Sequence, residues 1–148
     1  MSPMPAMRHV RVTEAISRVV GRQAPDSIFV TCAGAGVNLR GGRSYFIPDV
    51  TAIREAGIDD NSLGVASADV VLVVEVLSPS NARNDLILKR HEYAADKIPA
   101  YWIVDPEKQM LTVLEHDGDE HYREVGIFSE RFTVDNPFPI SIDLAEIF

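Results

Sequence analysis

The chain has 148 residues, with 14 Lys and Arg against 22 Asp and Glu, and therefore a net charge of −8 when His is neutral. Hydrophobic residues make up 46% of it and charged residues 24%, which excludes an intrinsically disordered chain and indicates one folded domain over residues 1–148. This acidic balance disfavours the broad basic surface of non-specific nucleic-acid binders, so any nucleic-acid contact must be local or metal-assisted.

Two further properties concern the compartment. No apolar run approaches the roughly 18 to 20 residues that cross a bilayer, and the N-terminus lacks the basic and then apolar pattern of a signal peptide. A single cysteine, Cys32, cannot form an internal disulfide, which agrees with a reducing compartment. We therefore expect a cytoplasmic protein that makes no membrane contact.

The first third of the chain predicts one helix followed by short strands. Apolar residues recur at helical spacing over about residues 8–22. Stretches rich in β-formers follow at residues 27–32, 36–39 and 45–53, and Gly41-Gly42 marks a turn before the third of them. This order predicts a meander of strands.

The middle of the chain predicts a buried strand and a second helix. Residues 69–77 read D-V-V-L-V-V-E-V-L, a continuous rather than alternating run, which is typical of a strand covered on both faces. We expect it to be the central strand. Ser78-Pro79-Ser80 ends it and supplies a capping hydroxyl for a helix over residues 81–97, which stops before Pro99.

The last third predicts mostly β-structure. Residues 101–104 form a further strand candidate, and residues 109–115 and 121–125 around Asp117-Gly118 predict a hairpin. A strand near Phe132 precedes a short terminal segment. The predicted fold class is α/β or α+β, with a mixed β-sheet flanked by helices and a C-terminal β-hairpin extension.

Glu75 is the most informative residue for chemistry. A carboxylate near the end of an apolar, doubly covered strand costs several kcal/mol of desolvation unless something neutralises it. A cation is the simplest remedy. The alternative is that Glu75 lies past the covered part of the strand and is solvated, or that it pairs with an arginine.

Asp49 follows Pro48 at the start of a strand, and taken alone this pair indicates only a turn. If this strand pairs antiparallel with residues 69–77, Asp49 faces Glu75 across the sheet. Two carboxylates there would require a divalent ion. Hard oxygen ligands suit Mg²⁺ or Mn²⁺.

Lys89 lies one helical turn after Asp85 and one turn before Tyr93. Asp85 and Lys89 could equally form a surface ion pair worth about 0.3 to 0.5 kcal/mol. A helical wheel places His91 among the apolar side chains, which predicts a packed histidine rather than a catalyst. The apolar side chains on this predicted face are Ile87, Leu88, Ala94 and Ala95.

Four groups of residues together resemble a known family. They are P-D-V at 48–50, V-V-E-V-L-S-P-S at 73–80, the trio Asp85, Lys89 and Tyr93, and Y-W-I-V-D-P at 101–106. In this combination the chain resembles the Uma-type putative restriction endonuclease family of the PD-(D/E)XK nuclease superfamily. The resemblance extends from about residue 9 to the end.

This resemblance implies a restriction-endonuclease-like fold with Asp49 and Glu75 as metal-binding carboxylates and the backbone carbonyl of Val76 as a further metal ligand. Lys89 would replace the superfamily lysine, which in the standard pattern lies two residues after the glutamate, where this chain has Leu77. The family usually carries an upstream acidic segment, for which Glu14 is a weak substitute. Flanking phosphates could be held by Arg83, Asn84 and Arg90, which could also simply be solvated.

We therefore expect an endonuclease that hydrolyses phosphodiester bonds in DNA with Mg²⁺ or Mn²⁺, using Asp49, Glu75 and Lys89. A homodimer is expected because cutting two strands needs two active sites. The alternative is a catalytically inactive nuclease fold that serves as a binding or regulatory protein, in view of the net charge and of Leu77. A third reading is a metal-dependent hydrolase of small phosphate compounds.

Overall fold

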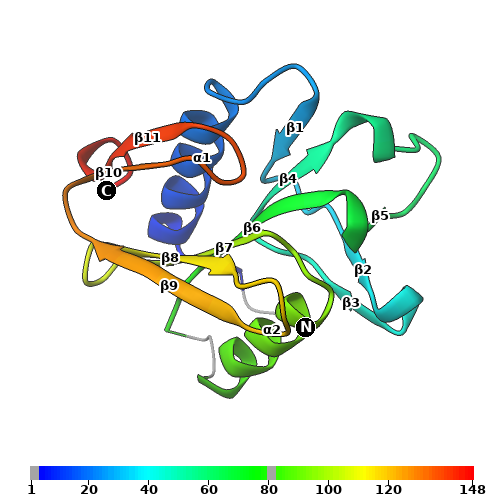
Figure 1. The fold of residues 1–148 in the computed structure, drawn as a ribbon. Coiled ribbons are helices and arrows are strands. Elements are labelled where there is room, and N and C mark those ends of the chain that lie inside the picture. The colour runs from blue at the N-terminus through cyan, green and yellow to red at the C-terminus, as the bar shows by residue number, and fades with distance from the viewer. Residues whose placement is uncertain (1–3, 80–82) are drawn as a thin grey trace.

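The fold is built on one mixed sheet. A computed structural model of the chain describes residues 4–79 and 83–148, and in it six strands hydrogen-bond in the order β1-β4-β6-β7-β8-β9 (Figure 1). β6 pairs antiparallel with β4 and parallel with β7. The strands are β1 (Ile28–Thr31), β4 (Val50–Arg54), β6 (Val70–Val76), β7 (Ala100–Asp105), β8 (Met110–His116) and β9 (Tyr122–Phe128). The predicted mixed sheet is confirmed.

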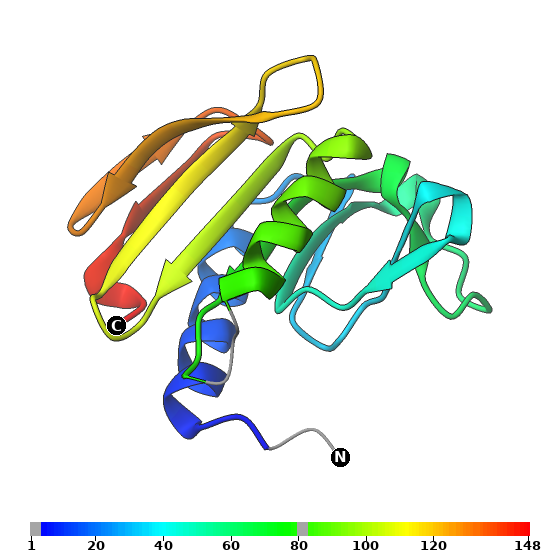
Figure 2. The same cartoon turned by 90° about the horizontal axis from the view of Figure 1, so that it is seen from below.

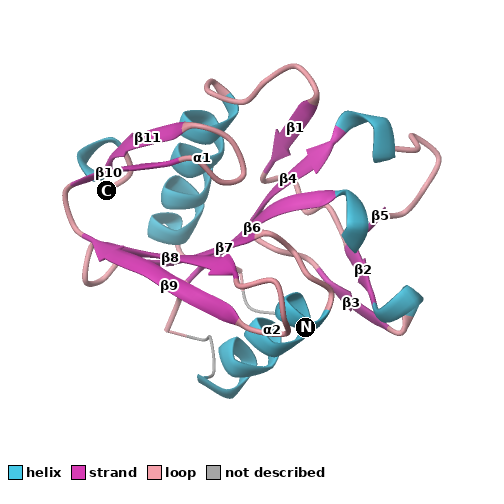
Figure 3. Cartoon of the chain, in the orientation of Figure 1, coloured by secondary structure: helices cyan, strands magenta, loops and turns pink. Residues whose placement is uncertain are grey.

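Two smaller sheets complete the β-structure (Figure 3). One is three-stranded, with β2 (Val37–Leu39) between β3 (Ser44–Phe46) and β5 (Val65–Ala66). The other pairs β10 (Arg131–Val134) with β11 (Ile140–Asp143). Single turns of 3-10 helix lie at Arg40–Gly42, Glu55–Gly57, Ser67–Asp69 and Leu144–Glu146.

The predicted meander is wrong in its connections. Residues 45–53, expected to form one strand, are divided between β3 and β4, which belong to different sheets. β1 pairs with β4, whereas β2 pairs with β3. Pro48 lies at the break, and because proline lacks a backbone N–H it cannot donate to a strand ladder. The break leaves Asp49 directly at the start of β4.

Helices cover both faces of the main sheet (Figure 2). α1 (Met7–Gly21) packs on one face together with β10 and β11, and α2 (Arg83–Ala95) packs on the other. Since successive side chains of a strand point to opposite faces, Leu72 and Val74 enter the α1 core and Val73 enters the α2 core. All seven residues of β6 are buried, which confirms the predicted central strand.

The buried face of α2 differs from the predicted one. Ile87 and Leu88 are 61% and 49% exposed and His91 is also exposed, so the expectation of a packed His91 is wrong. The helix instead packs through Tyr93, which is fully buried. Of the predicted apolar arc, Ala94 is buried, at 3% exposed, whereas Ile87 and Leu88 are not. Of the predicted start of this helix, residues 80–82 lie outside the described residues.

The C-terminal third adds strands at one edge. The hairpin around Asp117-Gly118 is confirmed as β8 and β9, which extend the main sheet, and Gly118 takes a left-handed φ of 90° in its turn. The terminal segment contains β11, which the sequence pattern did not reveal. None of the helices in the described part of the chain has the length and apolarity that crossing a membrane requires.

Candidate active site

Glu75 lies inside the protein at the carboxyl end of β6. It is 2% exposed, and its side chain lies on the face of the sheet that α2 covers. Its Oε1 accepts a hydrogen bond of 2.7 Å from the Tyr93 hydroxyl, and its Oε2 lies 3.2 Å from the Lys89 Nζ. The alternative reading of Glu75, as a solvated residue or the partner of an arginine, is therefore wrong.

The environment of Glu75 opposes its ionisation. Burial raises the pKa of its carboxyl from 4.5 to about 7, against the lowering effects of the Lys89 charge and the Tyr93 hydrogen bond, while the charge of Asp49 raises it further. Tyr93 stays protonated because burial and the neighbouring Glu75 raise the pKa of its hydroxyl. An additional cation beside Glu75 would favour the ionised carboxylate.

Asp49 joins three elements of the fold. Val50 pairs with Val74 in the antiparallel register of β4 and β6, so Asp49 lies next to Glu75 at the end of the ladder, as the sequence predicts. Its Oδ2 accepts a hydrogen bond of 2.7 Å from the Val76 N–H. Its Oδ1 lies 3.3 Å from the Nε2 of His9 on α1.

Lys89 points toward Glu75 from the next helix. Its Nζ lies 3.2 Å from Glu75 Oε2 and 3.3 Å from Asp85 Oδ2, and its side chain is only 16% exposed. The surface pair with Asp85 is therefore only part of its environment. Burial lowers the pKa of Lys89, but the charges of Glu75 and Asp85 outweigh it and the pKa is raised, so the ammonium stays charged.

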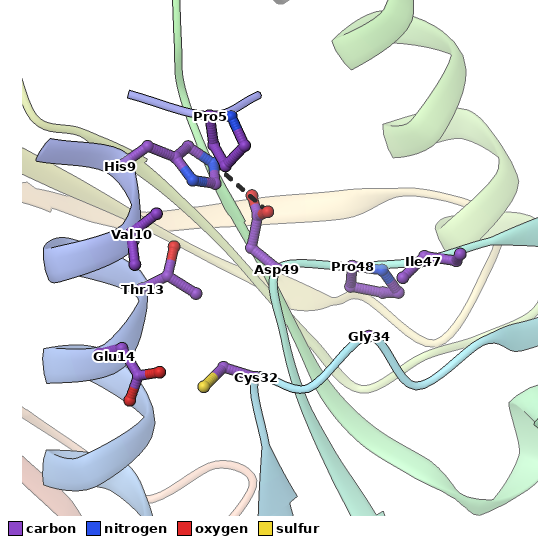
Figure 4. Close-up of a pocket in the computed structure, with 10 residues that line it drawn as sticks. All are labelled: Pro5, His9, Val10, Thr13, Glu14, Cys32, Gly34, Ile47, Pro48 and Asp49. Carbon is purple, nitrogen blue, oxygen red and sulfur yellow. Dashed lines mark ion pairs between the residues drawn. The ribbon is translucent and has the colours of Figure 1, made fainter. Parts of the chain in front are cut away.

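His9 and Tyr93 contact the two carboxylates, although sequence reasoning assigned neither a role. Tyr93 carries a weak signal, because it follows Lys89 by four residues and so lies on the same helix face. His9 carries none, since only the packing of α1 against β4 brings it to Asp49. Figure 4 shows His9 directed at Asp49. Both residues line a cavity of about 220 Å³.

The remaining predicted residues lie around this centre. Glu14 lines the same cavity, but in Figure 4 its carboxylate lies away from Asp49. Arg83 and Arg90 are exposed at the start and in the middle of α2. The side chain of Asn84 lies outside the described residues.

Asp49 and Glu75 form a donor set that fits a hard divalent cation. Each of their four oxygens has a protein partner, yet a carboxylate oxygen carries two lone pairs and can also bind a metal. Among the described residues no three His, Cys, Asp or Glu side chains are grouped closely enough to hold an ion. A cation here would therefore need backbone carbonyls, water or substrate oxygens to complete its shell.

Comparisons with known proteins concern the family and the fold. The model of the Uma2 family, described as putative restriction endonuclease, matches residues 1–145. The structure is similar to the crystal structure of a putative nuclease belonging to DUF820 from Anabaena variabilis, with a TM-score of 0.71 and 18% identity. That similarity covers 100% of this chain and 84% of the other. A search of curated proteins found no match.

The raised pKa of Glu75 predicts how stability depends on pH. The folded protein holds this proton more tightly than the unfolded chain, so the resulting stability is fully present below pH 4.5 and is lost as the pH rises through about 7. In EDTA, Glu75→Gln should therefore raise the free energy of unfolding at pH 8 by about 3 kcal/mol and leave it nearly unchanged at pH 4.5. Urea titrations at pH 4.5 and at pH 8 measure these free energies of unfolding, with the exposed Glu124→Gln as control. An equal effect at both pH values would contradict the buried carboxylate.

The Tyr93 hydroxyl should contribute more when Glu75 is ionised. Tyr93→Phe removes a hydrogen bond to a charged group and should cost about 1.5 to 3 kcal/mol at pH 8, and less at pH 5. Tyr122→Phe is the matched control, because its hydroxyl donates to the neutral carbonyl of Ile98. Its cost should be similar at both pH values. Parallel pH profiles for the two variants would refute the coupling to Glu75.

Proposed function

Because this chain belongs to the Uma2 family of putative restriction endonucleases, we propose that it is a metal-dependent endonuclease that hydrolyses phosphodiester bonds in DNA. The observation that carries this proposal is the contact of 3.2 Å between the Lys89 ammonium and the buried carboxylate of Glu75, which adjoins Asp49. Two acidic groups and one cation at the end of a central strand suit phosphoryl chemistry.

Asp49, Glu75 and the carbonyl of Val76 would hold Mg²⁺ or Mn²⁺. The bound ion would polarise the scissile phosphate and lower the pKa of a coordinated water. The protein orients the acids in advance, because the Val76 N–H and His9 fix Asp49 while Tyr93 fixes Glu75. Such fixed partners keep ligand geometry from varying and strengthen binding.

Lys89 would stabilise the charge that grows on the phosphate oxygens in the transition state. An ammonium suits this task because it acts as a compact point charge. It reaches the site from α2, whereas Leu77 occupies the strand position of the usual lysine. Its raised pKa keeps it cationic at neutral pH, which the role requires.

We extend the proposal to the assembly. Residues 1–148 would form one domain that acts as a homodimer on duplex DNA, because one copy supplies one set of Asp49, Glu75 and Lys89 and two strands need two sets.

Metal binding tests the carboxylates. Calorimetric titration with Mn²⁺ should show saturable binding, with a stability gain of about 2.7 kcal/mol at 100 times the dissociation constant. Asp49→Asn and Glu75→Gln should abolish both effects, whereas Asp60→Asn, in an exposed loop, should not. The variants that lose Mn²⁺ binding should also lose plasmid nicking, and the control variant should keep both. Binding without nicking would support a hydrolase of small phosphates or a regulatory protein, and no binding would support a catalytically inactive fold.

Lys89 should affect catalysis without supporting metal binding. Lys89→Met is expected to reduce nicking about 100-fold or more, as the loss of a charge-stabilising group does. Its Mn²⁺ affinity should stay equal or increase, because a positive charge leaves the neighbourhood of Glu75. The exposed Lys108→Met serves as control. Full nicking by Lys89→Met would remove Lys89 from the proposed site.

A further inference from the structure

We propose that an arginine face on α1, made of Arg8, Arg11 and Arg18, binds the phosphate backbone of the nucleic acid that the active site cuts. This inference rests on the proposed function and adds the surface along which the substrate lies. It concerns residues that the Asp49 and Glu75 site does not use.

The three arginines lie on one side of the helix. At 100° per residue their side chains fall within an arc of about 80°. All three are exposed, and on the helix they lie away from His9 and Thr13, which line the cavity at Asp49. From Arg8 to Arg18 the helix rises by about 15 Å, which corresponds to the rise of four to five base pairs along a duplex.

The arginines of this face take no part in the ion pairs that stabilise the described part of the fold. In the described part of the chain no carboxylate pairs with Arg8, Arg11 or Arg18. Arg22, one turn further along α1, differs because it pairs with Glu146 at 2.9 Å. Three other arginines are similarly paired, Arg40 with Glu92, Arg123 with Glu115 and Arg131 with Asp143. Unpaired exposed guanidinium groups remain available to an external anion.

The same arginines line a surface hollow. A space of about 720 Å³ lies between α1 and residues 145–148, and it is lined by the arginine face and also by Glu14 and Glu146. Glu146 is neutralised by Arg22, so the remaining local charge is positive.

The face is continuous with the active site. Arg8 also lines a second hollow, of about 320 Å³, together with His9 and with Ser78 beyond the end of β6. His9 in turn contacts Asp49. In Figure 2 the N-terminal half of α1 projects from the sheet beside the strand ends, so a ligand can lie along it.

The chemistry of the face selects a backbone rather than a base sequence. Arginine binds phosphate oxygens through its planar fork, and regularly spaced phosphates match regularly spaced guanidinium groups. Since the chain carries a net charge of −8, most of its surface repels a polyanion. A local arginine face therefore sets the orientation of the nucleic acid as well as its affinity.

Salt-dependent binding tests this surface. Fluorescence anisotropy with labelled 20-base-pair duplexes of DNA and of RNA is measured in Ca²⁺, with gels to confirm that the duplex stays intact. Arg11→Ala combined with Arg18→Ala should weaken binding about 10- to 30-fold near physiological salt and reduce the slope of log K against log salt by roughly 2. The control combines Arg43→Ala with Arg123→Ala, which removes the same charge elsewhere on the surface. Comparing the affinities for the DNA and RNA duplexes shows which of the two nucleic acids the arginine face binds.

Hydrolysis separates this inference from the proposed function. The double arginine variant should nick plasmid more slowly at limiting DNA yet cleave a small phosphodiester, bis-p-nitrophenyl phosphate, at the wild-type rate. Equal affinity and slope for both double variants would overturn the arginine face, even if the wild type cuts DNA. Arginine-dependent binding without any cleavage would support the face and refute the endonuclease. Absence of binding by the wild type would overturn both.

Discussion

The buried contact between Glu75 and Lys89 is the interaction on which the site depends. Glu75 belongs to a strand whose every residue is buried, and there an isolated carboxylate would cost several kcal/mol. Lys89 and Tyr93 offset this cost with an ammonium and a hydroxyl from one face of α2. α2 also packs on the sheet through the Tyr93 ring and Ala94, while Ile87 and Leu88 face outward.

Lys89 alone does not compensate the negative charge of the two carboxylates. Asp49 adds a second negative charge beside Glu75, and the pKa of Glu75 remains near 7 in spite of Lys89. A fold selected for stability alone would place an apolar residue at this position, as it does at Val74 and Val76. Residues that lower stability in this way commonly mark functional sites. The local arrangement thus supports the proposed metal-dependent activity.

α1 contributes both to the carboxylate site and to the proposed nucleic-acid-binding face. Its buried flank packs into the core and carries His9 to Asp49, while its exposed flank presents arginines that no carboxylate in the described residues neutralises. One helix can do both because its 3.6-residue period separates the flanks. The acidic character of the whole chain is compatible with the proposed arginine face, since most of the surface would repel a polyanion and a local basic face would orient it.

The sequence by itself determined the central strand and the two helices, because a continuous apolar run and a helical period are local patterns. The antiparallel pairing that brings Asp49 to Glu75 was only a conditional expectation, which the tertiary structure met. The sequence also placed Lys89 on the helix that follows Glu75. Only the tertiary structure decided that Pro48 divides two sheets, that α2 turns Tyr93 rather than Ile87 inward, and that His9 reaches Asp49. These outcomes depend on contacts between segments that lie far apart in the sequence, and a local pattern contains no information on such contacts.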